Sequence, residues 1–350
     1  MKKTLKSIIA IILAVVMVCS LAGCSSKATW SAKYNDETLS IGTYIYFLAY
    51  ASSEASYLVE NSEKSVLSQT VEGKPAETWI KERAQHYVNY LFAIDKMAKD
   101  RGISLTDEQK ENAKVSAKSL YTQMENLLKK YGVAESSFER VVIEEMLTEE
   151  IFEAIYADDG EIGNDDKVLG NKYEETYMAY EYAIIMLSTQ DAEGKTTFLK
   201  DEALAKGIEE ILGWVEDYNS GKITKEDFIK KYEASPYFHS EELEDGEKYE
   251  LIKSVDLKEN LANYSENIGK TEVGKACVDD FSNSGYVQVS FITDIKDETA
   301  EALKDESTRH TLIHACYQEE FEKKVEEVIK EIKVEYNTEE IDKINLKKFF

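Results

Sequence analysis

The feature that most constrains the fold is a run of helices between residues 76 and 155, because the sequence marks where they begin and end. Residues 76–101 repeat apolar side chains at a period of about 3.6 residues, which predicts an amphipathic helix. The residues of this stripe are Ile80, Ala84, Tyr87, Val88, Leu91, Ile94 and Ala98. Gly102 follows, and glycine is the residue most typical of a helix end.

Two further helices have start and stop signals. Thr106 with Gln109, and Ser136 with Glu139, match the capping box, in which each side chain bonds the backbone N–H of the other residue. Gly132 lies between these two helices and is expected to end the first of them. Three helices with explicit limits predict one helical module.

The two ends of the chain carry elements that cannot form a domain alone. Asn35 predicts a turn between two short extended pieces, and Ser40 can cap a helix that begins near Ile41. Residues 306–332 predict another amphipathic helix and residues 333–337 a short strand. The C-terminal helix needs a surface against which to bury its apolar stripe, and the N-terminal helices offer one. We therefore expect both chain ends to belong to one domain.

The segment between them has a different character. Residues 177–187 and 285–295 are rich in aromatic and β-branched residues and predict strands, the second with alternating apolar side chains. Residues 198–218 and 224–232 predict helices, and residues 233–250 predict a loop. The predicted fold class is therefore mainly α with an α+β insert.

Residues 1–23 have the pattern of a secretory signal peptide. Lys2, Lys3 and Lys6 precede an almost wholly apolar run from Ile8 to Ala22. This run is shorter than the roughly 20 residues with which a helix spans a bilayer. An uncleaved membrane anchor is the alternative interpretation.

The end of this segment, Leu-Ala-Gly-Cys at residues 21–24, resembles a bacterial lipobox. The resemblance implies cleavage before Cys24 and a diacylglycerol on its sulfur, usually with an acylated amino group as well. More than one acyl chain gives stable anchoring. We therefore expect the chain at the extracytoplasmic face of the cell membrane, with residues 24–29 as a tether.

Charge and cysteine content bear on other classes of protein. The formal net charge is −26, which argues against nucleic acid as a partner because phosphate binding needs a basic patch. Beyond Cys24 the only cysteines are Cys277 and Cys316, so the sequence has no disulfide framework. These two residues could pair or could be buried free thiols.

The order of these elements resembles the PrsA/SurA group of extracytoplasmic foldases. The resemblance lies in the lipobox, the strand-turn-helix start and the helical stretches AIDKMAKDRGISLTDEQ and YGVAESSFERVVIEEMLTEEIFEAI. It implies a SurA-like chaperone domain formed by residues 30–170 and 306–350. It also implies an inserted parvulin-like domain, a fold of peptidyl-prolyl cis-trans isomerases, at residues 176–298. A lipidated foldase of this group suggests a Gram-positive cell.

The parvulin-like part departs from the family pattern where catalysis would need it. Active parvulins carry one histidine just before the Ile-Leu pair of the first strand and another in the last strand. This chain has Ala183 and Val287 at these positions. The Gly-Gly-containing stretch is absent, and its region holds a lone His239. The resemblance thus implies a degenerate domain without catalytic residues, and whether the chain is an enzyme stays open.

The leading hypothesis is a lipid-anchored chaperone that binds unfolded or partly folded exported polypeptides and assists their folding, without efficient isomerase activity. The 22 tyrosines suit such binding because tyrosine offers amphipathic contact area at modest entropic cost, although filling of cores is the simpler explanation. The alternatives are an active parvulin-type isomerase with an unusual pocket and a solute-binding lipoprotein. The last class needs repeated βαβ units, which the long helical start contradicts. We expect no cofactor, and the sequence predicts neither clients nor an oligomeric state.

Weaker signals point to metal sites. His310 and His314 are four residues apart on the predicted C-terminal helix and could share a metal ion. The motif lacks the glutamate of HExxH and no third ligand is evident in the sequence, so we predict a packed pair and no metal site. The acidic pair Asp279-Asp280 lacks the spacing of a Ca²⁺ loop, and we expect it to be solvated.

Overall fold

The computed structural model describes residues 30–191, 193, 195–238 and 249–350. The predicted signal peptide, the lipid attachment at Cys24 and the tether lie outside the described residues, as does His239. Most of the described chain is helical, with small antiparallel sheets, as the sequence predicts. None of the described helices combines the length and the apolar character that a membrane span requires.

The chain divides into two compact units, which are described one at a time. Unit 1 contains the chain up to Gly163 together with Tyr317–Phe350, so it draws on both chain ends. Unit 2 is Asn164–Cys316.

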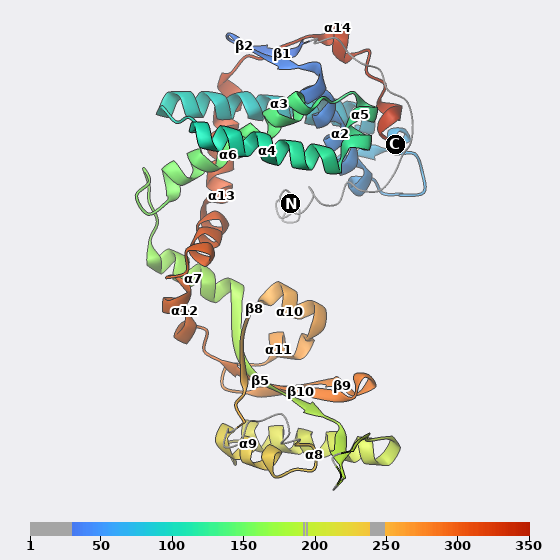
Figure 1. Ribbon diagram of the computed structural model, residues 1–350, viewed down its shortest axis with the longest axis vertical. Coiled ribbons are helices and arrows are strands. Elements are labelled where there is room, and N and C mark those ends of the chain that lie inside the picture. Colours follow the sequence, from blue (N-terminus) through green and yellow to red (C-terminus); the bar gives the residue numbers. More distant parts are fainter. Residues whose placement is uncertain (1–29, 192, 194, 239–248) are drawn as a thin grey trace. The chain divides into compact units, whose positions relative to one another are not determined.

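The helices of unit 1 begin and end at the following residues. They are α2 (Ile41–Leu58), α3 (Ala76–Arg101), α4 (Asp107–Gln123), α5 (Glu125–Tyr131), α6 (Glu135–Tyr156), the part of α13 (Glu306–Glu331) from Tyr317 onward, and α14 (Thr338–Ile341). In Figure 1, α3, α4 and α6 are among the longer helices of this unit. Short elements complete it: η2 (Val66–Ser68), β3 (Thr70–Val71), β4 (Lys74–Pro75) and η5 (Leu346–Phe349).

The predicted helix signals are confirmed with two exceptions. Ser40 caps α2, Thr106 and Gln109 form the capping box of α4, and Gly102 ends α3 with a left-handed φ of 67°. The predicted single helix between the two capping boxes is instead two, because Met124, at φ −105° and ψ 10°, separates α4 from α5. Gly132 ends α5.

The capping box predicted at Ser136 is wrong. Helix α6 begins two residues earlier than this box requires, at Glu135 after Ala134, whose carbonyl accepts from the backbone N–H of Ser137 and Phe138. Ser136 therefore lies inside the first turn. The hydroxyl of Ser137 lies 2.8 Å from that of Ser40, so the start of α6 is fixed to the start of α2 by a tertiary contact.

Strands from the two chain ends pair in unit 1. The sheet order is β11 (Glu335–Tyr336), β1 (Trp30–Tyr34) and β2 (Glu37–Ser40), with Ala32 opposite Tyr336. Asn35, at φ 52°, forms the predicted turn between β1 and β2. The hydroxyl of Tyr336 donates to Gln85 or Asn89 of α3, with oxygen distances of 2.9 and 2.8 Å.

The C-terminal half of α13 buries its apolar stripe within unit 1, as its pattern requires. Phe321 packs edge-on against Phe152 of α6 with ring centroids 5.4 Å apart. Tyr317 stacks on Tyr156 at 5.0 Å. Helix α6 is thus the surface that this part of α13 needs.

Unit 2 is built around a four-stranded antiparallel sheet in the order β8-β5-β10-β9. Its strands are β5 (Tyr177–Met186), β8 (Ile252–Leu257), β9 (Ala276–Phe281) and β10 (Tyr286–Thr293). A hairpin of β6 (Ser188–Gln190) and β7 (Thr196–Phe198) follows β5. The remaining elements are α7 (Asp166–Thr176), α8 (Asp201–Asn219), α9 (Lys225–Glu233), α10 (Lys258–Tyr264), α11 (Glu266–Lys270), η4 (Ser282–Ser284), α12 (Lys296–Ala302) and the start of α13.

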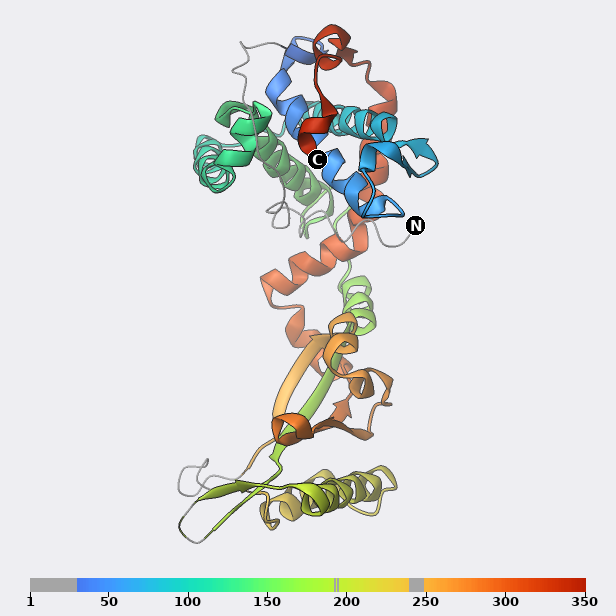
Figure 2. The ribbon, with the colours of Figure 1, turned by 90° about the vertical axis from the view of Figure 1, so that its right-hand side faces the viewer.

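Helices cover both faces of this sheet (Figures 1 and 2). Helices α8 and α9 lie against one face, where Trp214 and Phe228 pack on Ile185 and Phe291. Helices α10 and α11 cover part of the other face, where Leu261 and Ile268 belong to a smaller cluster of buried residues. We name these the α8/α9 face and the α10/α11 face.

Candidate functional site

The two positions at which active parvulins carry histidine lie in an apolar core. Ala183 of β5 and Val287 of β10 are fully buried on the α8/α9 face, among side chains such as Ile211 and Trp214. Neither side chain offers a proton or a hydrogen bond. They are not cross-strand partners either, since Ala183 pairs with Val289. Neither of these two positions therefore supplies a group that could assist isomerisation.

Polar side chains of the sheet gather instead on the α10/α11 face. The hydroxyl of Ser265 donates to Asp279 Oδ2 at 2.5 Å, and the amide of Asn267 donates to Asp279 Oδ1 at 2.9 Å. Asp279 is buried, so the expectation that it is solvated is wrong, whereas its neighbour Asp280 is exposed. The two donors come from the start of α11, and they satisfy both carboxylate oxygens. The role of Asp279 is therefore to fix α11 to β9.

Part of the α10/α11 face remains accessible. Ile252 of β8 is 48% exposed and Ile184 of β5 is 39% exposed. Tyr182 is directly opposite Ile252 in the ladder of β5 and β8, and Gln288 is directly opposite Ile184 in the ladder of β5 and β10. These four residues form a mainly apolar strip that runs from β8 across β5 to β10.

A second accessible apolar surface lies along α2 in unit 1. The buried stripe of α2 includes Tyr44, Phe47 and Leu48. Tyr44 therefore fills the core, which is the simpler of the two explanations that the sequence offers for the tyrosines. On another side of the same helix, Tyr46 and Tyr50 are half-buried and Tyr57 is exposed, and the helix ends at the exposed Leu58. We call these last four residues the α2 aromatic stripe. Such a stripe could not be separated from a core stripe by sequence, because both have helical spacing.

Tyr50 of the α2 aromatic stripe lies beside a charged network that joins α2 to α3. Tyr50 packs edge-on against Tyr87 of α3, with ring centroids 5.2 Å apart. Arg83 Nε and Nη2 donate to the two oxygens of Glu54 at 3.0 and 3.1 Å, and the Tyr87 hydroxyl donates to Glu54 at 2.6 Å. Burial raises the pKa of Tyr50, and the nearby carboxylate of Glu54 raises it further, so this hydroxyl stays protonated and can donate a hydrogen bond. The network fixes Tyr87, against which the half-buried ring of Tyr50 packs.

Buried carboxyl groups of unit 1 lie on α3 and α6. Glu144 of α6 is buried, and burial raises its pKa to about 8. Asp95 of α3 forms an ion pair with Arg140 of α6, yet burial raises its pKa to about 6 and outweighs the opposing effect of the guanidinium. The sequence reasoning missed both carboxyl groups, because a charged residue between apolar ones on a helix gives no signal of its depth.

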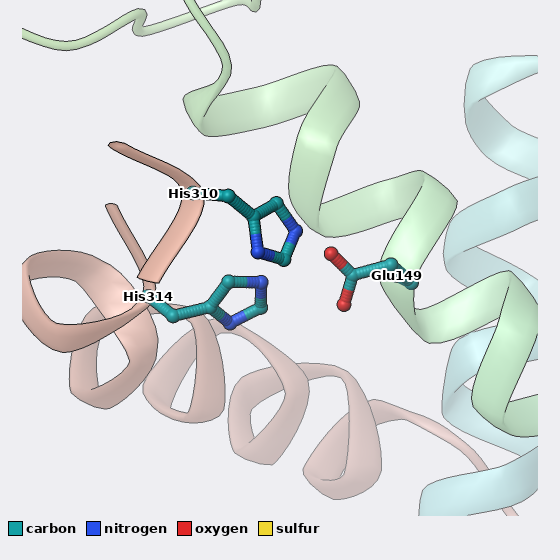
Figure 3. Close-up of side chains that lie close together, drawn as sticks. All are labelled: Glu149, His310 and His314. Carbon is teal, nitrogen blue, oxygen red and sulfur yellow. The ribbon is translucent and has the colours of Figure 1, made fainter. Parts of the chain in front are cut away.

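His310 and His314 lie one turn apart on α13, with ring centroids 4.6 Å apart (Figure 3). His310 is exposed and His314 is half-buried. Figure 3 also labels Glu149, which belongs to α6 in unit 1, whereas both histidines belong to unit 2. The pair alone offers two nitrogen ligands, fewer than the three or four protein ligands of a typical zinc site.

The two cysteines within the described residues are free thiols. Burial raises the pKa of Cys277 to about 11, and burial also raises the pKa of Cys316. A thiol with a raised pKa is a poor nucleophile at neutral pH. Neither residue is thus a candidate for covalent catalysis.

Comparison with known proteins gives similarity to solved structures alone. No protein-family model matches the chain, and no curated protein sequence matches it. A crystal structure of the foldase protein PrsA from Lactococcus lactis is similar over 93% of this chain and 99% of that chain, at 13% identity and a TM-score of 0.33. A crystal structure of PrsA from Bacillus subtilis is similar over 75% of this chain and 88% of that chain, at 17% identity and a TM-score of 0.26.

Proposed function

We propose that this chain is an extracytoplasmic chaperone that binds unfolded exported polypeptides and lacks efficient prolyl isomerase activity. It would be held at the membrane through lipid on Cys24. Unit 1 would act as the SurA-like chaperone domain, and the four-stranded sheet with its helices as a degenerate parvulin-like domain. The single observation that carries the proposal is the α2 aromatic stripe.

This stripe has the properties that binding of many different polypeptides requires. Its tyrosines present apolar ring faces together with a hydroxyl, so they can contact apolar side chains and bond a client backbone. Tyr57 is 71% exposed and Leu58 is 42% exposed, so both side chains are accessible to an apolar partner. Glu54 and Arg83 fix Tyr87, and Tyr50 of the stripe packs against Tyr87. The ring of Tyr50 is therefore ordered before a client arrives, which lowers the entropic cost of binding.

The acidic character of the chain favours one class of client. A formal net charge of −26 attracts basic polypeptides and repels acidic ones at low salt. We therefore expect basic unfolded chains to bind best, and we expect their binding to weaken as salt rises.

The absence of efficient isomerisation follows from Ala183 and Val287. Both side chains are pure hydrocarbon and fully buried in a mainly apolar core, so neither can donate or accept a hydrogen bond or a proton. The α10/α11 face holds Asp279, whose two oxygens are already bonded by Ser265 and Asn267. Binding without turnover needs none of these groups.

The test is suppression of aggregation of reduced lysozyme, a basic unfolded client, by the purified chain without its first 24 residues. The double variant Tyr57→Ser/Leu58→Ser removes the exposed end of the α2 aromatic stripe. The matched control is Val115→Ser/Ile162→Ser, which removes two apolar side chains of unit 1 that are 61% and 54% exposed and lie off α2. All four substitutions affect exposed side chains, so stability should change by about 0.5 kcal/mol or less each.

We expect the α2 double variant to need at least about fivefold more protein for equal suppression, since the loss of even one apolar contact worth roughly 1 kcal/mol weakens binding about fivefold. The control should act like the unchanged chain. Equal activity of the two double variants would remove the α2 aromatic stripe from the proposal. No suppression by the unchanged, folded chain would refute the chaperone function itself.

A further inference from the structure

The two edges of the four-stranded sheet differ in how their backbone groups are satisfied. At the β9 edge, the side chain of Asn219 accepts from the N–H of Ala276 at 2.7 Å and donates to its carbonyl at 2.8 Å. The side chain of Asn267 donates to the carbonyl of Val278 at 2.9 Å. Asparagine amides thus take the place that a neighbouring strand would have. The β9 edge is closed to further pairing.

The hydrogen-bonding pattern also fixes which residues of β8 point outward. In an antiparallel sheet, successive residues of a strand bond alternately to the neighbours on either side. Ala276 and Val278 point outward at β9, and the ladders of β9, β10, β5 and β8 carry this alternation across the sheet without a register shift. Lys253 and Val255 therefore direct their N–H and C=O groups away from β5, as does Leu257 at the end of the strand.

Nothing within the described part of the chain bonds these outward groups of Lys253 and Val255. Strand β8 also lacks most of the features that protect edge strands, since IKSVDL contains no proline and no glycine and its ladder contains no bulge. Its one protective feature is the exposed Lys253. The edge is open over a length that suits a short extended segment.

The side chains of β8 indicate what such a segment would carry. The side chains of Ile252 and Val255 lie on opposite faces of the sheet and are 48% and 38% exposed. Each face of the edge therefore offers an apolar side chain. A paired strand would place its own side chains beside them, and apolar or β-branched partners stabilise such cross-strand pairs. The adjacent strip of Tyr182 and Ile184 extends the apolar surface on the α10/α11 face.

We propose that the β8 edge binds an extended apolar segment of a client polypeptide as a fifth strand of the sheet. This inference rests on the proposed chaperone function and adds a second contact to it. The occupant is a client and not a second copy of the chain, because two chains that each carry a net charge of −26 repel one another. Backbone pairing makes such binding independent of client sequence, which suits a chaperone.

The test measures binding of a labelled eight-residue peptide of alternating valine and lysine by fluorescence anisotropy. The protein is again the chain without its first 24 residues. Val255→Pro removes one outward N–H, and an outward-facing proline is tolerated at a sheet edge. The matched control Val255→Thr keeps the N–H and the β-branched shape. A second peptide, methylated at every internal amide nitrogen, keeps the charge and the side chains but cannot donate to the edge.

We expect Val255→Pro to weaken binding of the unmodified peptide by about tenfold, because it removes one backbone hydrogen bond and weakens the adjacent ones. Val255→Thr should weaken binding by less than about threefold. The methylated peptide should bind the unchanged chain at least about tenfold more weakly. Equal binding of the two peptides to the unchanged chain overturns the proposal, and this comparison decides even if circular dichroism shows Val255→Pro to be unfolded.

Three further results are informative. If folded Val255→Pro binds the peptide like Val255→Thr, the edge is not the contact and the proposal fails. The proposed chaperone function is tested separately: if the unchanged chain suppresses lysozyme aggregation, that function stands even though the β8 edge proposal has failed. A dimer of the unchanged chain in light scattering that becomes a monomer in Val255→Pro would make a second copy the occupant and overturn the assignment to a client.

Discussion

The buried carboxyl group of Glu144 predicts a strong dependence of stability on pH. Glu144 is 8% exposed, and burial, assisted by the neighbouring charge of Glu145, raises its pKa from 4.5 to about 8. The native state therefore favours the protonated acid. Below pH 4.5 the group is protonated in the folded and unfolded chains alike, and it does not oppose folding. As pH rises from 4.5 to 8, Glu144 ionises in the unfolded chain but stays protonated in the folded chain, so the free energy of unfolding falls. Above pH 8 the group ionises in the folded chain as well, and the free energy of unfolding falls no further.

The size of the effect follows from the shift in pKa. A shift of one unit corresponds to about 1.4 kcal/mol, so between pH 5 and pH 9 Glu144 should lower the free energy of unfolding by roughly 4 kcal/mol. A loss of that size is a large part of the stability of a typical domain. Asp95, whose pKa burial raises to about 6, adds a loss in the same direction, but mainly below pH 6.

The substitution Glu144→Gln isolates this contribution. Glutamine has nearly the shape of the protonated acid, and Thr148, whose hydroxyl lies 3.1 Å from Oε1 of Glu144, keeps its partner. We expect the variant to match the unchanged chain at pH 5 and to be more stable by roughly 3 to 4 kcal/mol at pH 9. Urea unfolding followed by tryptophan fluorescence at pH 5, 7 and 9 measures both values.

The control for this experiment is Glu135→Gln on the same helix. Glu135 is exposed in the first turn of α6, so its substitution should leave the difference between pH 5 and pH 9 unchanged. Parallel pH profiles for Glu144→Gln and the unchanged chain would refute the reasoning, because they would show that Glu144 ionises as readily in the folded state as in the unfolded one.

Two further predictions concern the chain ends and catalysis. Tyr336→Phe removes the hydroxyl that bonds α3 at Gln85 or Asn89, and it should lower the free energy of unfolding of unit 1 by about 1 kcal/mol, measured by urea unfolding; no change would mean that water replaces the bond without loss. The chain without its first 24 residues should not accelerate cis-trans isomerisation of a proline-containing model peptide. A clear acceleration would show that a pocket other than the surroundings of Ala183 and Val287 performs the chemistry.

Much of the helical architecture could be predicted because its signals are local. The capping box of Thr106 and Gln109 and the glycine stop at Gly102 involve residues a few positions apart, and both form as expected. The box at Ser136 fails for a tertiary reason. Ser137 contacts Ser40, 97 positions away, and this contact lies at the helix start, where Ala134 accepts the first backbone hydrogen bonds in place of a side-chain cap.

The candidate sites were much harder to predict. Asp279 and Asp280 are neighbours with the same charge, yet Asp279 is buried by Ser265 and Asn267 while Asp280 is exposed. Strand β8 was not among the predicted strands, and it carries no regular alternation of burial because it lies at an edge. Its environment depends on which strand it pairs with, and that strand is about 75 residues earlier in the chain.

The sequence by itself determined where most helices and the two central strands lie, because backbone propensity, capping and the period of apolar residues act within a few turns of chain. It also predicted a lipobox and the lack of histidine at residues 183 and 287, which are matters of residue identity. Only the tertiary structure decided which tyrosines remain accessible on α2, which carboxyl groups are buried, and which sheet edge stays open. These properties arise when segments far apart in sequence pack together, since burial and hydrogen-bond satisfaction depend on the partner and not on the residue alone.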